Sequence, residues 1–192
     1  MRKPLIAANW KLNGDLVLCR QFAEALTNVQ TLFSDASKKL VPEVLVCPPA
    51  VYINSLSSLI GDAVETESQS RSILQVGAQN VAVEESGAFT GEISAQMLAE
   101  AGANYCIVGH SERRALFGET DADVLAKCQR LAAENITPIF CIGEPLDIRE
   151  QGDAEGFVAS QLRSVLSHWS GNDATKLVLA YEPLWAIGTG VS

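Results

Sequence analysis

The stretch Leu177-Val-Leu-Ala-Tyr-Glu-Pro183 shows the pattern that decides the fold. A continuous apolar run stops at a carboxylate, and the following proline biases Glu182 toward an extended backbone and ends the strand. Continuous apolar runs of this length are typical of parallel strands that are buried on both faces. The sequence contains six such runs, at residues 4–8, 44–47, 73–77, 105–109, 138–142 and 177–181.

Segments with helical spacing of apolar residues lie between these runs. The clearest are residues 16–26, 121–134 and 156–166, and shorter ones are residues 51–60 and 94–101. In the segment 156–166 the spacing predicts that Gln161 faces solvent. The strands start about 30 to 40 residues apart, which is the length of a βα unit. Because no linker interrupts the series, we predict one α/β domain over residues 1–192.

Repeated βα units form either an open doubly wound sheet or a closed (β/α)8 barrel. Polar residues follow most of the predicted strands, namely Asn9, Lys11, Gln79, Asn80, His110, Ser111, Glu144 and Glu182. In a barrel, polar groups at the C-terminal ends of many strands meet at one mouth, whereas an open sheet usually concentrates its site at one crevice. Because polar groups follow most of the strands here, the barrel is favoured. A barrel has eight units and typically about 250 residues. The chain therefore supplies about six of the eight units and is incomplete at its C-terminus.

The composition narrows the possible partners. Hydrophobic residues make up 47% and charged residues 19%, which is typical of a globular chain. The formal net charge is −9, which argues against nucleic acid and anionic membranes as main partners. A small anionic substrate remains compatible, because a pocket can be positive on an acidic protein.

Cysteine and histidine usage points to a reducing compartment and argues against a metal site built on several imidazoles. The five cysteines are an odd number and form no C-x-x-C pair, so we expect reduced thiols in a cytoplasmic protein. The first apolar run is too short for a signal peptide, and no run approaches the length of a membrane span. With only His110 and His168 in the sequence, a site built on several imidazoles is almost excluded.

Glu182 and His110 are the main candidates for acid–base chemistry. A carboxylate in a mostly apolar setting is partly desolvated and accepts a proton more readily, which suits a general base. His110 follows a strand, and Ser111 is predicted to cap the turn that begins there. Amide N–H groups at a helix start oppose a positive imidazole and keep it neutral. Each residue also has a structural alternative, a solvated carboxylate and a backbone-bonded histidine.

Other residues have candidate supporting roles. Lys11 is expected inside the fold, where its ammonium can hold a phosphate or an oxyanion, and Asn9 is expected to position it or to touch the same ligand. Residues 183–190 suit a lid with a stiff start and a glycine-rich end, whose amides at Gly188 and Gly190 can bind phosphate oxygens. Glu144 and Arg113 are expected to pair structurally.

Taken together, these motifs resemble the triosephosphate isomerase family. The matching stretches are Asn9-Trp-Lys-Leu-Asn13, Gly77-Ala-Gln-Asn80, Ser86-Gly-Ala-Phe-Thr-Gly-Glu92, Ile107-Val-Gly-His-Ser-Glu-Arg-Arg114, Cys141-Ile-Gly-Glu144 and Ala180-Tyr-Glu-Pro-Leu-Trp-Ala-Ile-Gly-Thr-Gly190. They span the whole chain in the family's order.

The resemblance implies an isomerase of glycolysis and gluconeogenesis that interconverts dihydroxyacetone phosphate and glyceraldehyde 3-phosphate without cofactor or metal. By the same resemblance, Glu182 transfers the proton between the two carbons, and His110 polarises the carbonyl oxygens and shuttles protons through an enediolate. Lys11 stabilises negative charge. Asn9 helps to place the substrate and Gly188 binds its phosphate. The resemblance also implies a homodimer in which Thr90 reaches toward the partner's site.

The chain departs from the family because the seventh and eighth strands, with half of the phosphate grip, have no counterpart. We therefore expect this shortened chain alone to be poorly active. Two alternatives remain at this stage. One is another sugar-phosphate barrel isomerase or epimerase, and the other is a non-catalytic fragment that assembles with other chains.

Overall fold

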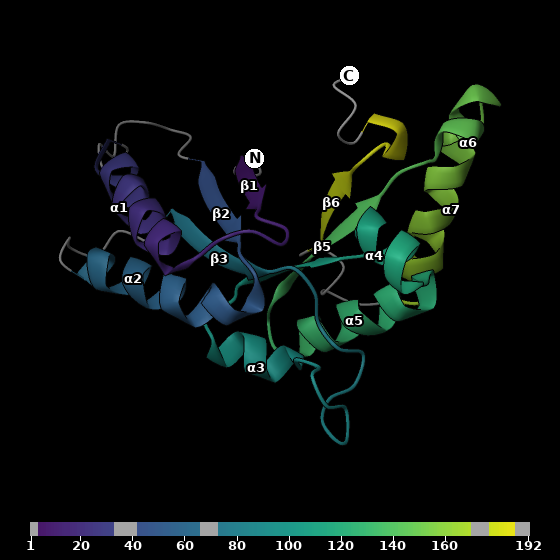
Figure 1. Cartoon of the computed structure of the whole chain (residues 1–192). Helices are drawn as coiled ribbons and strands as arrows, with labels where there is room; N and C mark the ends of the chain where they lie inside the picture. The colour runs from purple at the N-terminus through teal and green to yellow at the C-terminus, as the bar shows by residue number, and fades with distance from the viewer. Residues whose placement is uncertain (1–3, 33–41, 66–72, 170–176, 187–192) are drawn as a thin grey trace. The chain divides into compact units, whose positions relative to one another are not determined.

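The computed structural model describes residues 4–32, 42–65, 73–169 and 177–186 (Figure 1). The chain divides into two compact units. The first comprises Met1–Gln79 and Gln96–Cys106, and the second comprises Asn80–Ala95 and Ile107–Ser192. A single domain over residues 1–192 stays a prediction.

Parallel strands form the centre of the first unit. They are β1 (Leu5–Asn9), β2 (Glu43–Cys47), β3 (Leu74–Ala78) and the first two residues of β4 (Tyr105–Val108). The register aligns Ala7 with Leu45, Val46 with Val76, and Gly77 with Tyr105. Parallel strands need crossover connections, and the helical segments of the sequence supply them.

Three helices follow the strands of this unit: α1 (Leu16–Leu32), α2 (Ile53–Glu65), which continues a 3-10 turn η1 (Ala50–Tyr52), and α3 (Ala95–Glu100). Helices α1 and α2 lie side by side (Figure 1). The core between helices and strands contains the fully buried side chains of Leu45, Ile53 and Leu56. Burying apolar surface of this kind is the main stabilising contribution to such a unit.

The second unit contains the rest of β4 and the parallel pair β5 (Thr137–Ile142) and β6 (Val178–Tyr181). Its helices are α4 (Ser111–Phe117), α5 (Asp121–Ala133), α6 (Leu146–Glu150) and α7 (Ala154–Leu166), and a 3-10 turn η3 (Leu184–Ala186) follows β6. Helix α5 packs against α7 and β5 and starts at a capping box of Thr120 and Asp123. Phe140 and Leu131 are fully buried in its core.

Strand order decides between the two predicted architectures. The strands are hydrogen-bonded neighbours in chain order, β1-β2-β3-β4-β5-β6. A doubly wound sheet reverses its strand order at a switch point, and this series shows no reversal. The order is that of a partial (β/α) barrel, as predicted.

The predicted strands are confirmed to within one residue at each end. The helices agree less closely, since α1 continues to Leu32 and α7 starts at Ala154. Helices α4 and α6, which span 7 and 5 residues, were not predicted.

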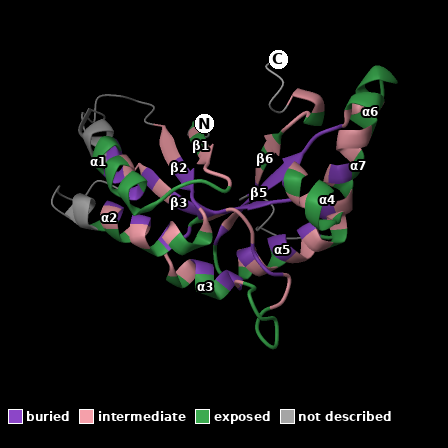
Figure 2. Cartoon of the chain, viewed as in Figure 1, coloured by how far each residue is buried: buried purple, intermediate pink, exposed green. Residues whose placement is uncertain are grey.

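Burial differs between inner and outer strands (Figure 2). Most residues of β2, β3 and β5 are buried, whereas β1 and β6 carry exposed apolar side chains, among them Ile6, Leu179 and Tyr181. The five cysteines are free and buried, and burial raises the pKa of Cys47 to about 12. Among the described helices, none is long and apolar enough to cross a membrane.

Candidate active site

His110 lies between β4 and α4, at the start of the helix. Its side chain is buried, and Nδ1 accepts a hydrogen bond of 3.2 Å from the backbone N–H of Glu112. The prediction that Ser111 caps this turn is wrong, because His110 itself is the N-cap. Since Nδ1 acts as an acceptor, the ring proton of the neutral imidazole is on Nε2.

The peptide groups of Gly109, just before His110, are held by charged side chains. The Gly109 N–H donates to Glu119 Oε1 at 2.7 Å, and the Gly109 carbonyl accepts from Arg114 Nε at 2.9 Å. Gly109 has φ of +69°, a conformation that favours glycine. These contacts fix the backbone from which His110 projects.

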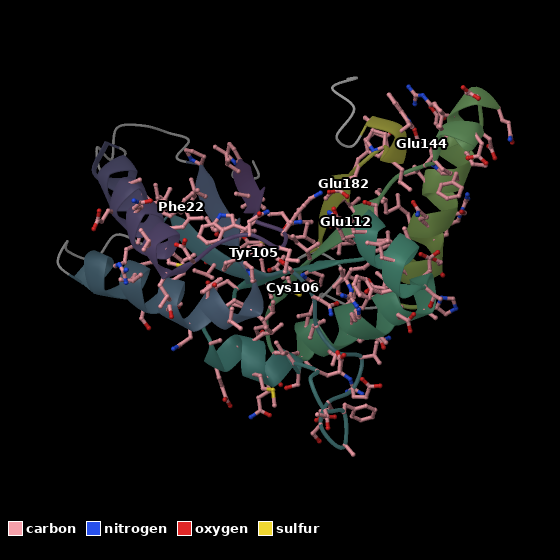
Figure 3. All side chains as sticks on the ribbon, viewed as in Figure 1. Phe22, Tyr105, Cys106, Glu112, Glu144 and Glu182 are labelled. Carbon is pink, nitrogen blue, oxygen red and sulfur yellow. The ribbon has the colours of Figure 1, made fainter. Side chains whose placement is uncertain are left out.

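Glu182 follows β6, and its N–H donates to the Ile142 carbonyl at 2.7 Å. Figure 3 shows Glu182 at the end of β6, in the same unit as Glu112 and Glu144. Glu182 Oε1 lies 3.6 Å from His110 Nε2. Glu182 Oε2 is buried and has no hydrogen-bond partner in the described part of the chain. An unsatisfied buried carboxylate oxygen is unusual in proteins and is found at reactive sites.

A small hollow lies beside the Glu182 carboxylate. Ser111, Gly143, Gln161 and Leu184 line it, and it encloses about 10 Å³, which is room for about one water molecule. This hollow is too small for a triose-sized molecule.

Lys11 and Asn9 belong to the first unit. Lys11 has φ of +52°, which is uncommon for a residue with a side chain. Its N–H donates to Asn9 Oδ1 at 2.9 Å, and its carbonyl accepts from Gln79 Nε2 at 2.9 Å. Gln79 Nε2 also donates to the Cys47 carbonyl. The strained backbone of Lys11 is thus held from both sides, and sequence analysis had assigned Gln79 no role.

Two further predicted site residues are Gly188, from the predicted lid, and Thr90. Gly188 lies outside the described residues. Thr90 is exposed at the tip of the irregular segment that follows β3. The base of this segment is anchored on α5, because Lys127 Nζ donates to Asn80 Oδ1 at 2.8 Å and Arg130 Nε donates to the Val83 carbonyl at 3.0 Å.

Glu144 is fully buried beside the start of the predicted lid. Tyr181 Oη and Trp185 Nε1 donate to its carboxylate at about 3.0 Å. Burial raises the pKa of Glu144, but the hydrogen bonds from Trp185, from its own backbone and from Tyr181 outweigh this and lower the pKa overall. The predicted pairing with Arg113 is wrong, because Glu144 lies 3.6 Å from Arg149 instead.

Arg113 pairs with Glu119, which is also bonded to Lys127. The Glu119 and Lys127 side chains are almost completely buried. Burial raises the pKa of Glu119, but the hydrogen bonds from Lys127 and Arg113 outweigh this and hold the pKa below its ordinary value of 4.5.

The second unit therefore presents a carboxylate opposite an imidazole N–H. A carboxylate in this position can remove a proton from carbon while the imidazole donates a hydrogen bond to the adjacent oxygen. Among the described residues, no group of three or more His, Cys, Asp and Glu side chains could hold a metal ion.

Comparison with known proteins identifies the family. The family described as triosephosphate isomerase matches residues 4–192. The chain belongs to this family. A relative from Albidiferax ferrireducens, named triosephosphate isomerase, is 48% identical over 99% of this chain and 70% of its own length. Relatives of the same name from Alkalilimnicola ehrlichii and Alcanivorax borkumensis are 45% and 43% identical, over 69% of their own length. The match favours an isomerase of this family over the other sugar-phosphate barrels.

The buried Glu119–Lys127 pair predicts a dependence of stability on pH. Because the pKa of Glu119 is lowered on folding, its contribution is present above the unfolded value of 4.5 and is lost as pH falls through the folded value. Glu119→Gln leaves the Lys127 charge without its partner, and we expect a loss of about 3 to 5 kcal/mol at pH 7.

Urea denaturation of the wild-type chain and the Glu119→Gln variant at pH 7 and pH 4 measures this effect. The difference between the two should be smaller at pH 4, and Glu119→Gln/Lys127→Met should be more stable than Glu119→Gln. Equal differences at both pH values would contradict the assignment.

Proposed function

We propose that this chain carries the catalytic groups of a triose-phosphate isomerase, acting on dihydroxyacetone phosphate and glyceraldehyde 3-phosphate in glycolysis and gluconeogenesis. The supporting observation is the 3.6 Å separation between Glu182 Oε1 and His110 Nε2. These groups come from residues far apart in the sequence, and both belong to the second unit.

The reaction uses the two groups in sequence. The Glu182 carboxylate removes a proton from the carbon beside the substrate carbonyl, and the electron pair of that C–H bond moves toward the carbonyl oxygen. His110 Nε2–H donates a hydrogen bond to this oxygen and moves protons between the two oxygens of the enediolate. Glu182 then returns its proton to the neighbouring carbon. No electrons are gained or lost, so the step needs no redox cofactor, and we propose no metal.

Further residues bind the substrate. Lys11 stabilises the negative charge of the substrate, Asn9 places it, and Gly188 binds its phosphate. The hydrogen bonds that hold the Lys11 backbone are compatible with this role, because they fix the point from which the ammonium projects. Exclusion of water by a lid would protect the enediolate.

We also propose a homodimer in the cytoplasm. The segment that carries Thr90 has an anchored base and an exposed tip, as expected for a loop that docks on another copy of the chain. The five buried free thiols fit a reducing compartment.

A non-catalytic assembling fragment is the second candidate function. The observation that favours it is the exposure of Ile6 on β1 and of Leu179 and Tyr181 on β6, which are 58%, 48% and 53% exposed. Exposed apolar side chains on edge strands favour pairing with another chain.

The chain as given should show little or no isomerase activity. About two βα units of a complete barrel have no counterpart in this chain. Half of the proposed phosphate-binding site belongs to these units. An assay coupled to a dehydrogenase, on purified chain whose intact mass has been checked, measures the turnover. Near-normal turnover would contradict this expectation, whereas large assemblies that bind no phosphate analogue would favour the fragment function.

In the chain extended by the two further βα units, Glu182→Asp and His110→Gln should each lower kcat by about 100-fold or more, because general acid–base groups contribute factors of this size. His168→Gln is the matched control, since His168 is exposed near the end of α7. Unchanged rates in the two site variants would remove the assigned roles.

Thr90→Glu should shift the chain from dimer toward monomer without loss of folding, because a charge at the exposed loop tip opposes docking. Size-exclusion chromatography with light scattering measures the mass, and Gln129→Glu, on an exposed position of α5, adds the same charge elsewhere. A mass that is equal in both variants and in the wild-type chain would contradict docking through this loop.

A further inference from the structure

Gly143, in the loop after β5, is in close contact with the backbone of Glu182, the proposed catalytic base. If Gly143 carried a Cβ atom, it would lie 1.9 Å from the Glu182 carbonyl oxygen and 2.6 Å from the Glu182 carbonyl carbon. Such distances are impossible between non-bonded atoms, so the Glu182 peptide can occupy its position only because residue 143 is glycine. The requirement is for space, since the backbone of Gly143 is not in the left-handed region.

A buried glutamine holds this glycine in place. Gln161 on α7 is 7% exposed, and its Oε1 accepts the Gly143 N–H at 3.0 Å. The prediction that Gln161 faces solvent is therefore wrong. The helical pattern assigns polar residues to the outside, but a buried backbone N–H needs an acceptor, and Gln161 supplies it.

Backbone hydrogen bonds tie the chain around Glu182 to both sides of Gly143. The Glu182 N–H donates to the Ile142 carbonyl at 2.7 Å, and the Leu184 N–H donates to the Glu144 carbonyl at 3.0 Å. Gly143 lies in the chain between the two accepting residues, Ile142 and Glu144. It contacts the Glu182 carbonyl, which lies between the two donating N–H groups. Its position therefore sets how closely the Glu182 backbone approaches the end of β5.

We infer that Gly143 and Gln161 are positioning residues that set the distance from the Glu182 carboxylate to His110. The inference rests on the proposed function for its consequence in catalysis, but the geometry concerns only the second unit. Glu182 Oε2 has no hydrogen-bond partner in the described part of the chain, so no side-chain hydrogen bond to this oxygen holds the carboxylate in place.

Gly143→Ala and Gln161→Met test the two parts of this arrangement, which are the space beside the Glu182 carbonyl and the hydrogen bond from the Gly143 N–H. The first adds a methyl group against the Glu182 carbonyl, and the second keeps a side chain of similar length but removes the acceptor for the Gly143 N–H. Two controls are available. Gly61→Ala adds the same methyl group where no atom lies within 4 Å. Val165→Ala removes buried volume from α7, one turn after Gln161.

The deciding measurement is the NMR spectrum of the histidine rings in the full chain labelled at histidine. The sequence has only His110 and His168, so the exposed His168 provides an internal reference. Moving the Glu182 carboxylate changes the field at His110 Nε2. We therefore expect shifted His110 ring signals in Gly143→Ala and Gln161→Met and unchanged His110 signals in both controls. His168 should stay unchanged in the two glycine variants, whereas its N–H is bonded to Val165, which one of the α7 variants replaces.

The Val165→Ala control separates positioning from stability. It should lower the melting temperature without moving the His110 signals, because it removes buried volume but keeps the hydrogen bond from Gly143 to Gln161. His110 signals that stay at their wild-type positions in folded Gly143→Ala and Gln161→Met would overturn the inference. If Gly143→Ala does not fold, Gln161→Met decides in the same way.

Turnover distinguishes this inference from the proposed function. In the chain extended by the two further βα units, Gly143→Ala should lower kcat about 100-fold, as expected for a displacement near 1 Å, and change KM less. An extended chain without turnover would refute the proposed function, whereas His110 signals that shift as expected would still support the positioning role. Measurable turnover with unchanged kcat and unshifted signals would refute the positioning role alone.

Discussion

The parallel pairing of β5 with β6 is the constraint on which the site depends. Its register aligns Ile142 with Tyr181, so the next peptide, that of Glu182, bonds to the Ile142 carbonyl. This bond and the contact with Gly143 place the carboxylate within 3.6 Å of His110 Nε2. A slip of one residue would turn every side chain of β6 to the opposite face, and Glu182 would no longer face the imidazole.

Buried charged side chains in the second unit hold backbone and loops. Glu119 accepts the N–H of Gly109 beside the imidazole, and Glu144 accepts bonds from two side chains around the predicted lid. Buried carboxylates are costly unless they are paired and hydrogen-bonded, and both are satisfied here. Their hydrogen bonds hold the course of the chain beside His110 and beside Glu182.

The length of the family match and the exposure of the outer strands lead to the same conclusion. The chain spans about 70% of the length of its relatives, and β1 and β6 carry exposed apolar side chains. Both observations agree with a partial barrel, whose outer strands offer edges for further strands. The candidate catalytic pair is nevertheless formed within one unit, because β4, β5 and β6 together carry both groups and their supports.

The sequence by itself determined the six strands, their alternation with helices and the identity of the polar residues that follow them. Continuous apolar runs are local signals, and they located the strands to within one residue. Only the tertiary structure decided what these polar residues touch: Gln161 turned inward to Gly143, Glu144 joined Tyr181 and Trp185 and not Arg113, and His110 replaced Ser111 as the cap. Helical and strand periodicity indicates which face of an element is apolar. The position of a polar side chain depends instead on the backbone group with which it forms a hydrogen bond. That group becomes a neighbour only when the chain has folded.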